Sequence, residues 1–265
     1  MTGEAMTRAI GYDESGAGQP VLFIHGFPHD RSLWAAQLSG LAARARCLAP
    51  DLPGFGQSAP LAGAPSMDAY ADALAAFLAS TGIARATVCG LSMGGYVAFA
   101  LWRRHPALVR ALVFASTRAA PDTDEARAKR RDLAELVRHE GSGAMAERQL
   151  PGMLGKSTRR RHPELAAAMW RMLAAAPLDG VLQALEAMAA RPDSTPTLST
   201  ITVPTLFIAG AQDVIVPAAE MRAMHEQVAG SAFEVIAGAG HACNFERPAA
   251  FNHLLGEFLV GLDGN

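Results

Sequence analysis

The chain has 265 residues, 50% of them hydrophobic, and its 23 basic and 25 acidic residues leave a formal net charge of −2. This length accommodates one large domain or two small ones with a substantial core. The near-neutral charge argues against a nucleic-acid-binding surface, and no apolar run approaches the roughly 20 residues that a membrane span needs. The 3 cysteines lack metal-ligand spacing, so neither a metal site nor a disulfide framework is expected.

The start of the chain predicts neither a signal peptide nor a complete hairpin. Glu4 and Arg8 stand among small residues without the apolar core of a signal peptide. We therefore expect a soluble cytoplasmic protein that does not bind membranes. The segment from Arg8 to Tyr12 leaves room for only one edge strand.

Short apolar runs then alternate with amphipathic patterns, which is typical of a mostly parallel sheet covered by helices. The predicted strands are short and rich in β-branched and aromatic residues, as buried parallel strands are. They comprise residues 21–24, 46–49, 87–89, 111–115, 205–209 and 233–236. Between them, apolar stripes such as Tyr70, Leu74 and Leu78 predict helices. Ser66 is the expected N-cap of one helix, and Pro217 stands at the first turn of another.

The alternation breaks between residues 118 and 204, where no strand pattern occurs. Glycines and prolines at short intervals predict several short helices there. The interrupting residues are Gly141, Gly143, Pro151, Gly152, Pro163, Pro177 and Pro192. We interpret residues 118–204 as a helical cap, inserted between strands of a core that comprises residues 1–117 and 205–265.

The pentapeptide Gly90-Leu91-Ser92-Met93-Gly94 follows the predicted strand at 87–89 and precedes a helical pattern. Such a serine occupies a sharp strand-to-helix turn with strained backbone angles, which exposes its hydroxyl. Glycines two residues to either side avoid collisions across the turn. The pattern predicts that Ser92 is a nucleophile.

A serine hydroxyl needs a general base, and the base needs an orienting carboxylate. His241, in the loop after the last predicted strand, is the expected base. Asp213, directly after the strand at 205–209, is the expected acid. An alternative acid after the strand at 111–115 would be Asp122 or Asp124. The other histidines with a helical context are expected at the surface or in structural roles; they are His105, His139, His162 and His225.

The mechanism also requires two N–H groups that bind the oxyanion of the tetrahedral intermediate. Met93, at the start of the predicted helix, is one expected donor, and Phe27 in the loop after the first strong strand is the other. In that loop His25 is expected to pack as a structural residue and Asp30 to cap a helix. A position of His29 facing the pocket is an alternative that we do not favour.

Five motifs now stand in a consistent order along the chain. They are His25-Gly26-Phe27-Pro28, the segment 51–58, the segment 90–95, Gly210-Ala211-Gln212-Asp213 and Gly238-Ala239-Gly240-His241. From about residue 20 to 259 the chain resembles the α/β-hydrolase superfamily, and within it the small capped esterases and the enol-lactonases that act on 3-oxoadipate enol-lactone.

This resemblance implies an α/β fold with a mostly parallel central sheet, flanking helices and an inserted cap. It makes Ser92 the nucleophile, Asp213 the acid and His241 the base, with the backbone of Phe27 and Met93 forming the oxyanion hole. The segment 51–58 has a structural role in the family. A serine at the elbow excludes the aspartate-dependent dehalogenases and epoxide hydrolases.

The expected reaction is hydrolysis of a small-to-medium, fairly apolar ester through an acyl-enzyme, without cofactor or metal. Met145, Met169 and Trp170 are candidates to line an apolar pocket under the cap. For any single one of them, packing of the cap onto the sheet is the favoured interpretation. The same three catalytic groups serve an enol-lactonase or a carbon–carbon bond hydrolase. The non-enzymatic alternative is a sensor protein that binds a small ligand and retains only vestigial hydrolytic activity.

Overall fold

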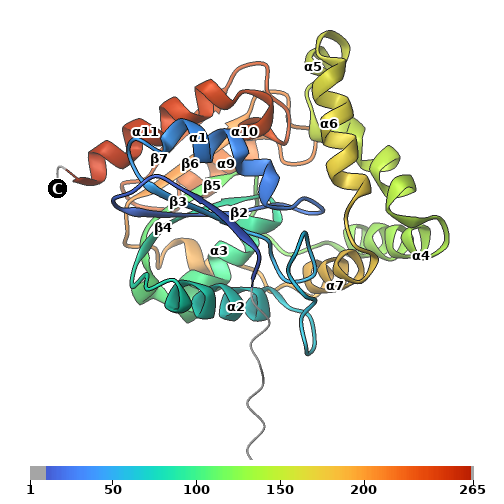
Figure 1. Cartoon of the computed structure of the whole chain (residues 1–265), viewed down its shortest axis with the longest axis horizontal. Helices are drawn as coiled ribbons and strands as arrows, with labels where there is room; N and C mark the ends of the chain where they lie inside the picture. Colours follow the sequence, from blue (N-terminus) through green and yellow to red (C-terminus); the bar gives the residue numbers. More distant parts are fainter. Residues whose placement is uncertain (1–9, 264–265) are drawn as a thin grey trace, which may run out of the picture.

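The computed structural model describes residues 10–263, which form a sheet of seven strands in the order β1-β3-β2-β4-β5-β6-β7 (Figure 1). Only β1 runs antiparallel to its neighbour β3. This architecture confirms the predicted α/β fold class. The strands are β1 (Tyr12–Ser15), β2 (Pro20–Ile24), β3 (Arg46–Pro50), β4 (Ala86–Leu91), β5 (Val109–Ala115), β6 (Thr205–Gly210) and β7 (Ala232–Ile236).

All six strands predicted from apolar runs are present. Five of them are mostly buried, and such parallel strands carry side chains that are apolar on both faces. The edge strand β7 is buried only at Ile236. The edge strand lies later than expected. Residues 8 and 9 of the predicted segment are outside the described residues, and β1 begins at Tyr12, pairing Tyr12 with Pro50 and Ser15 with Cys47. Its residues Tyr12–Ser15 are mostly exposed, so no apolar run marked the strand.

Helices cover both faces of the sheet (Figure 1). Residues of α1 (Ala35–Leu41) and α11 (Pro248–Asp263) share one buried cluster with Val21 and Phe23. Residues of α2 (Met67–Ser80), α3 (Met93–Arg104) and α9 (Ala218–His225) share the other cluster with Leu22 and Ile24. Successive residues of β2 therefore face opposite layers, as the pleat of a strand requires.

Two helix starts were predicted from single residues. The hydroxyl of Ser66 accepts a hydrogen bond from the N–H of Ala69 and caps α2, as expected. Pro217 precedes the first residue of α9, Ala218, so it lies one position before the predicted first turn.

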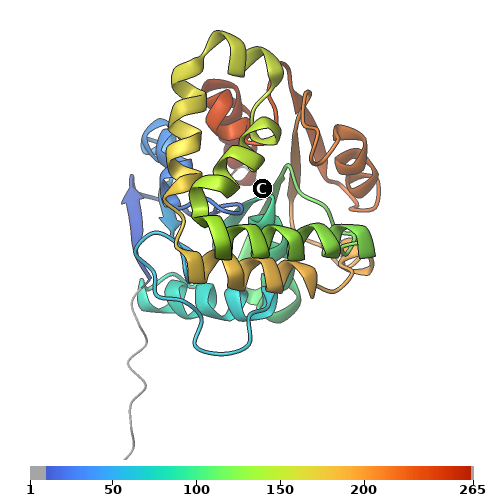
Figure 2. The same ribbon diagram turned by 90° about the vertical axis from the view of Figure 1, so that its right-hand side faces the viewer.

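The chain between β5 and β6 forms five helices. Four of them, α4 to α7, lie together on one side of the molecule (Figure 1), the side that faces the viewer in Figure 2. They are α4 (Asp124–Met153), α5 (Lys156–Arg161), α6 (Pro163–Ala174), α7 (Leu178–Ala189) and α8 (Thr195–Leu198). We call residues 118–204 the helical insertion. Within the described residues no single helix meets the length and hydropathy of a membrane span, whereas α6 and α7 do so only as a pair bent by 90°.

Only some of the residues predicted to interrupt these helices lie at a helix break or a helix start. Gly141 breaks α4 with a φ of 80°, a conformation that glycine adopts readily. Pro163 starts α6 and Pro177 precedes α7, as expected of proline at a helix start. Gly143, Pro151 and Gly152 instead lie inside α4, so the prediction that they interrupt a helix was wrong.

Two contacts fix the helical insertion to the core near α7. Gly54, in the turn after β3, has a φ of 87°, and a Cβ on Gly180 of α7 would lie 1.8 Å from the Gly54 carbonyl oxygen. Only glycine permits such an approach. The Gln183 side chain also exchanges two hydrogen bonds of 3.0 Å with the backbone of Leu61. The glycine-rich segment 51–58 therefore provides a docking point for α7.

Candidate active site

Ser92 lies between β4 and α3 with φ 55° and ψ −115°, in the strained region that the pentapeptide predicted. A Cβ on Gly90 would lie 2.3 Å from the Gly94 carbonyl oxygen. A Cβ on Gly94 would lie 2.2 Å from the carbonyl oxygen of Ile24. Glycine is thus required at both positions for steric reasons. The turn leaves Ser92 partly exposed at the carboxyl end of the parallel strands.

Thr117, just after β5, supports this turn and was not predicted. Its hydroxyl donates a 2.7 Å hydrogen bond to the Ser92 carbonyl oxygen, while the Ser92 N–H donates to the Ala115 carbonyl oxygen at 2.9 Å. A Cβ on Gly95 would lie 2.4 Å from the Thr117 hydroxyl. The strained serine is therefore held by the neighbouring strand β5.

Asp213 and His241 meet at the same sheet edge. Asp213 follows β6, His241 follows β7, and Nδ1 of His241 lies 2.8 Å from Oδ2 of Asp213. Both side chains are buried, with total exposures of 7% and 2%. The other oxygen of Asp213 accepts the N–H groups of Ile215 and Val216 at 2.8 and 2.9 Å, which orient the carboxylate.

The pKa of Asp213 lies below its ordinary value of 3.8. Burial alone would raise this pKa. The charge of His241, its hydrogen bond and the two backbone N–H groups outweigh burial and lower the pKa. An ionised Asp213 requires a donor at Nδ1 of His241, which leaves Nε2 as the unprotonated nitrogen of the neutral ring.

The competing acids are engaged elsewhere. Asp122 is buried and forms ion pairs with Arg130 and Arg191, and Asp124 pairs with Arg127 at 2.9 Å. Among the described residues, neither has a hydrogen bond to a histidine. Asp213 is therefore the carboxylate that contacts His241.

The other histidines behave largely as expected. His25 is buried, its Nδ1 donates to the Gly26 carbonyl oxygen at 2.9 Å, and its Nε2 accepts the Leu52 N–H at 2.9 Å. This pairing fixes His25 as a structural residue. His225 is partly buried, bonds to the Ser231 hydroxyl at 2.7 Å and stacks on Phe233. The more exposed His105, His139 and His162 each lie beside an acidic side chain.

Two backbone N–H groups next to Ser92 have no protein acceptor within residues 10–263. Met93 is the first residue of α3, where no intrahelical acceptor exists, and Phe27 lies in the loop after β2. A Cβ on Gly26 would lie 3.2 Å from the Ser92 Cβ, so this loop adjoins the elbow. Asp30 caps the following helical turn through the Ser32 N–H at 2.8 Å, as predicted.

Glu246 is a further buried residue of this region that sequence reasoning missed. It ends α10 (Cys243–Glu246) and is 3% exposed. Its carboxylate accepts the Gly240 N–H at 2.7 Å, the Gly155 N–H at 2.9 Å and the Thr158 hydroxyl. Gly240 precedes His241, whereas Gly155 and Thr158 belong to the helical insertion. One carboxylate thus ties the His241 loop to the helical insertion.

Removal of this tether has a predictable effect. Glu246→Ala leaves three buried donors unpartnered, so we expect the free energy of unfolding to fall by about 3 kcal/mol or more. Glu246→Gln, which retains one acceptor oxygen, should lose less. Urea unfolding measures both, with Glu257→Ala as a control because the Glu257 side chain is 65% exposed. Equal stability of Glu246→Ala and the parent would contradict this role.

The three residues proposed to line a substrate pocket have different surroundings. Met145 and Met169 are fully buried, in the two separate hydrophobic clusters of the molecule. Trp170 is half-buried, and its Nε1–H donates to Glu147 at 3.0 Å. It borders a groove of about 530 Å³ between α4 and α6 whose lining includes none of the predicted catalytic residues. Substrate contact by these three residues stays a prediction.

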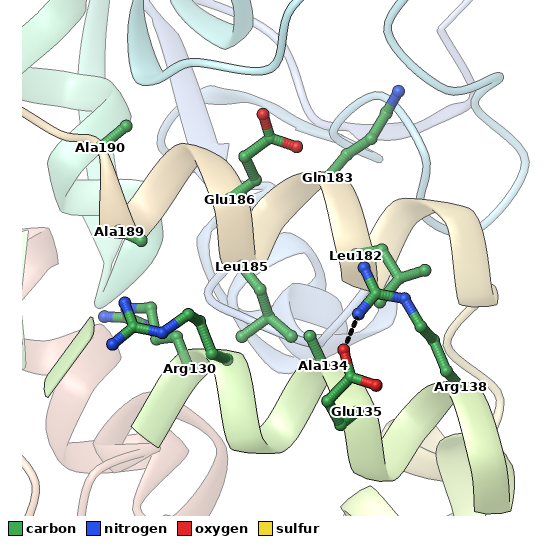
Figure 3. A pocket seen from close by; sticks show the side chains of 11 residues that line it. Arg130, Ala134, Glu135, Arg138, Leu182, Gln183, Leu185, Glu186, Ala189 and Ala190 are labelled. Carbon is green, nitrogen blue, oxygen red and sulfur yellow. Dashed lines mark hydrogen bonds and ion pairs between the residues drawn. The ribbon is translucent and has the colours of Figure 1, made fainter. Parts of the chain in front are cut away.

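A second groove of about 600 Å³ lies between α4 and α7. Figure 3 shows Ala134 and Leu185 between the two helices, with Glu135 and Arg138 paired beside them. Its lining likewise contains none of the residues predicted for catalysis. This groove separates two helices of the insertion and is distinct from the Ser92 elbow.

Comparisons with known proteins agree with this architecture. A solved thermophilic esterase from Thermogutta terrifontis shares 41% identity, with a TM-score of 0.93 over 96% of this chain and 93% of that one. The 3-oxoadipate enol-lactonase 2 of Acinetobacter baylyi is 31% identical over 92% of this chain and 91% of its own length. The 2-hydroxymuconate semialdehyde hydrolase of a Pseudomonas species is 30% identical over 94% and 90%, respectively.

The model of the α/β-hydrolase-fold family matches residues 19–248, which include strands β2 to β7, the helical insertion, the loop after β2 and the loop that contains His241. The sheet order, the strained serine between β4 and α3, and relatives that cover nearly the whole chain all agree with this match. The chain therefore belongs to the α/β-hydrolase family.

Proposed function

We propose that the protein is a serine hydrolase that cleaves a small-to-medium, fairly apolar carboxylic ester through Ser92, His241 and Asp213. The observation that carries this proposal is the buried 2.8 Å contact between His241 and Asp213, at the sheet edge where Ser92 occupies its strained turn. A nucleophile, a base and an orienting acid are the three groups that acyl transfer from a serine requires.

In the first half-reaction Oγ of Ser92 attacks the ester carbonyl carbon, and Nε2 of His241 takes the hydroxyl proton. The N–H groups of Phe27 and Met93 donate to the resulting oxyanion. Collapse of the intermediate breaks the bond to the alcohol oxygen, and His241 returns its proton to that oxygen. An acyl-enzyme and a free alcohol result.

In the second half-reaction water attacks the acyl carbon while His241 takes one proton from it. Collapse of the second intermediate releases the carboxylic acid and returns the proton to Oγ of Ser92. Asp213 stays ionised throughout, holds the Nδ1–H tautomer and stabilises the imidazolium form. The low pKa of Asp213 supports this role.

The charges around the site favour a neutral ester over an anionic lactone. Arg118, which follows Thr117, pairs with Glu220 at 3.2 Å and donates to the Ile215 carbonyl oxygen. A substrate carboxylate would have to compete with Glu220 for this guanidinium, which disfavours an anionic substrate. An enol-lactonase remains the second candidate, because a curated relative of nearly equal length has that name.

We also propose that the helical insertion, residues 118–204, is the cap of this site and the core comprises residues 1–117 and 205–265. The Glu246 tether supports the cap assignment, because it joins the start of α5 to the residue before His241. A cap fixed beside the base is well placed to shape the substrate pocket.

A substrate panel tests the proposal. We expect turnover of p-nitrophenyl acetate, butanoate and octanoate, with lower kcat/KM for 3-oxoadipate enol-lactone and for dienoic diketo acids. A preference for the lactone would favour the enol-lactonase, and activity on diketo acids alone would favour carbon–carbon bond hydrolysis. Negligible turnover of the whole panel would instead favour a ligand-binding sensor.

A further inference from the structure

His29 is a buried histidine whose two ring nitrogens have no hydrogen bond of good geometry within residues 10–263. It lies in the loop after β2 and is 1% exposed. Its backbone N–H donates to the Gly26 carbonyl oxygen at 3.0 Å, so the loop itself is ordered around it. Buried polar side chains in folded proteins are nearly always hydrogen-bonded, and this exception needs an explanation.

Four residues earlier in the same loop, His25 shows what a structural histidine looks like in this fold. Both of its ring nitrogens are paired, one with the Gly26 carbonyl oxygen and one with the Leu52 N–H. A leucine would fill the volume of the His29 ring without leaving two polar atoms unpaired. Packing therefore accounts for His25 and not for His29.

His29 lies near the residues that we propose for catalysis. Gly26, at the start of the loop, approaches Ser92 closely enough that a Cβ on it would lie 3.2 Å from the Ser92 Cβ. Phe27, the proposed oxyanion donor, lies between Gly26 and His29. His241 is near enough for its charge to act on the His29 ring. The free imidazole thus borders the groups that would surround a bound ester.

The charge state of His29 restricts what it can bind. Burial, followed by the charges of His25 and His241, lowers the pKa of His29 to about 3 and outweighs the opposing effects of the Gly26 backbone and the Asp30 charge. The ring is therefore neutral at physiological pH, with one N–H donor and one acceptor nitrogen. A neutral ring without a carboxylate partner is neither a second general base nor an anchor for an anionic group.

We propose that His29 is a specificity-determining residue whose neutral imidazole hydrogen-bonds an uncharged hydroxyl or carbonyl group on the substrate, close to the scissile ester carbonyl. This inference rests on the ester hydrolase function proposed above and narrows its substrate class to hydroxy- or oxo-substituted esters. A site that holds a buried polar group discriminates against analogues that leave this group unpaired.

Three ethyl esters of matched length test the inference: ethyl butanoate, ethyl 3-hydroxybutanoate and ethyl 3-oxobutanoate, followed by acid release in a pH-stat. For each polar ester we divide its kcat/KM by that of ethyl butanoate. We expect this ratio to fall by about tenfold or more in His29→Leu. His29→Gln, which keeps a donor and an acceptor, should retain part of the preference. The control His225→Leu, which alters a histidine bonded to Ser231, should leave the ratio unchanged.

Melting temperature separates this role from packing. If the ring forms hydrogen bonds only with substrate, His29→Leu replaces a polar side chain without a partner by an apolar one. The variant protein should then be at least as stable as the parent. Equal ratios in the parent and His29→Leu would overturn this inference alone. A parent enzyme that hydrolyses none of the three esters, nor any p-nitrophenyl ester, would overturn the proposed function together with it.

Discussion

Ser92→Ala is expected to lower kcat/KM for p-nitrophenyl butanoate by at least about 10³-fold, because the attacking oxygen is removed. The remaining activity would come from the two free N–H groups of Phe27 and Met93, which still bind an oxyanion when water attacks. The comparison requires steady-state kinetics of purified parent and variant at several ester concentrations.

The fold should persist in this variant. Alanine fits the space of serine in the turn, and the hydrogen bonds of the Ser92 backbone with Thr117 and Ala115 do not involve the lost hydroxyl. We expect a melting temperature within about 3 °C of the parent. Undiminished ester turnover by the variant would show that another residue is the nucleophile.

Asp213→Asn is expected to lower kcat by about 10⁴-fold at neutral pH while leaving the pocket shape nearly intact. The amide NH₂ of asparagine can donate to Nδ1 of His241, which moves the ring proton to Nε2. A protonated Nε2 cannot take the Ser92 proton. If His241 is paired instead with another acid in solution, Asp213→Asn would retain most of its activity, whereas Asp122→Asn would not.

The same substitution has a pH-dependent effect on stability. Because the folded pKa of Asp213 lies below 3.8, its ionised form stabilises the fold at all pH values above this ordinary value. That stabilisation is lost as the pH falls through the lowered folded pKa. The stability difference between the parent and Asp213→Asn should therefore be constant near neutrality and shrink on acidification below 3.8, as urea unfolding at a series of pH values can measure.

The sequence was sufficient for the central strands β2 to β6, because each of these buried strands is a local apolar run. It was sufficient for Ser92, because the glycine at 90 avoids a contact within the turn itself, where an added Cβ would lie 2.3 Å from the Gly94 carbonyl oxygen. Gly94 instead avoids the neighbouring strand β2, where a Cβ would lie 2.2 Å from the Ile24 carbonyl oxygen. Asp213 and His241 were found from their positions after β6 and β7. Their mutual contact of 2.8 Å follows from the adjacency of these strands.

Long-range contacts, by contrast, leave no local pattern. Glu246 joins residues 155, 158 and 240, and nothing in the neighbouring sequence distinguishes it from a surface glutamate. The sequence does not predict the close approach of Gly180 to Gly54 either, since a glycine inside a helical segment is usually interpreted as an interruption of the helix. The edge strand β1 was predicted too early in the chain for a related reason. Its side chains are mostly exposed, so no apolar run marks its position.

His29 is an intermediate case. Its place in the loop after β2 was evident, but whether its ring is paired depends on side chains distant in sequence. The structure supplies that information, since neither ring nitrogen has a hydrogen bond within the part of the chain that it describes. The strongest clue in the sequence was the presence of two histidines, His25 and His29, in one short loop.

Covalent labelling tests the identity of the nucleophile most directly. Diethyl p-nitrophenyl phosphate transfers its diethylphosphoryl group to an activated serine Oγ, and p-nitrophenol leaves. Mass spectrometry of the digested protein should locate one such group on Ser92, and the His241→Ala variant should react far more slowly. A label on another residue, such as the nearby Ser116, which also has a positive φ of 44°, or no label at all, would contradict the assignment.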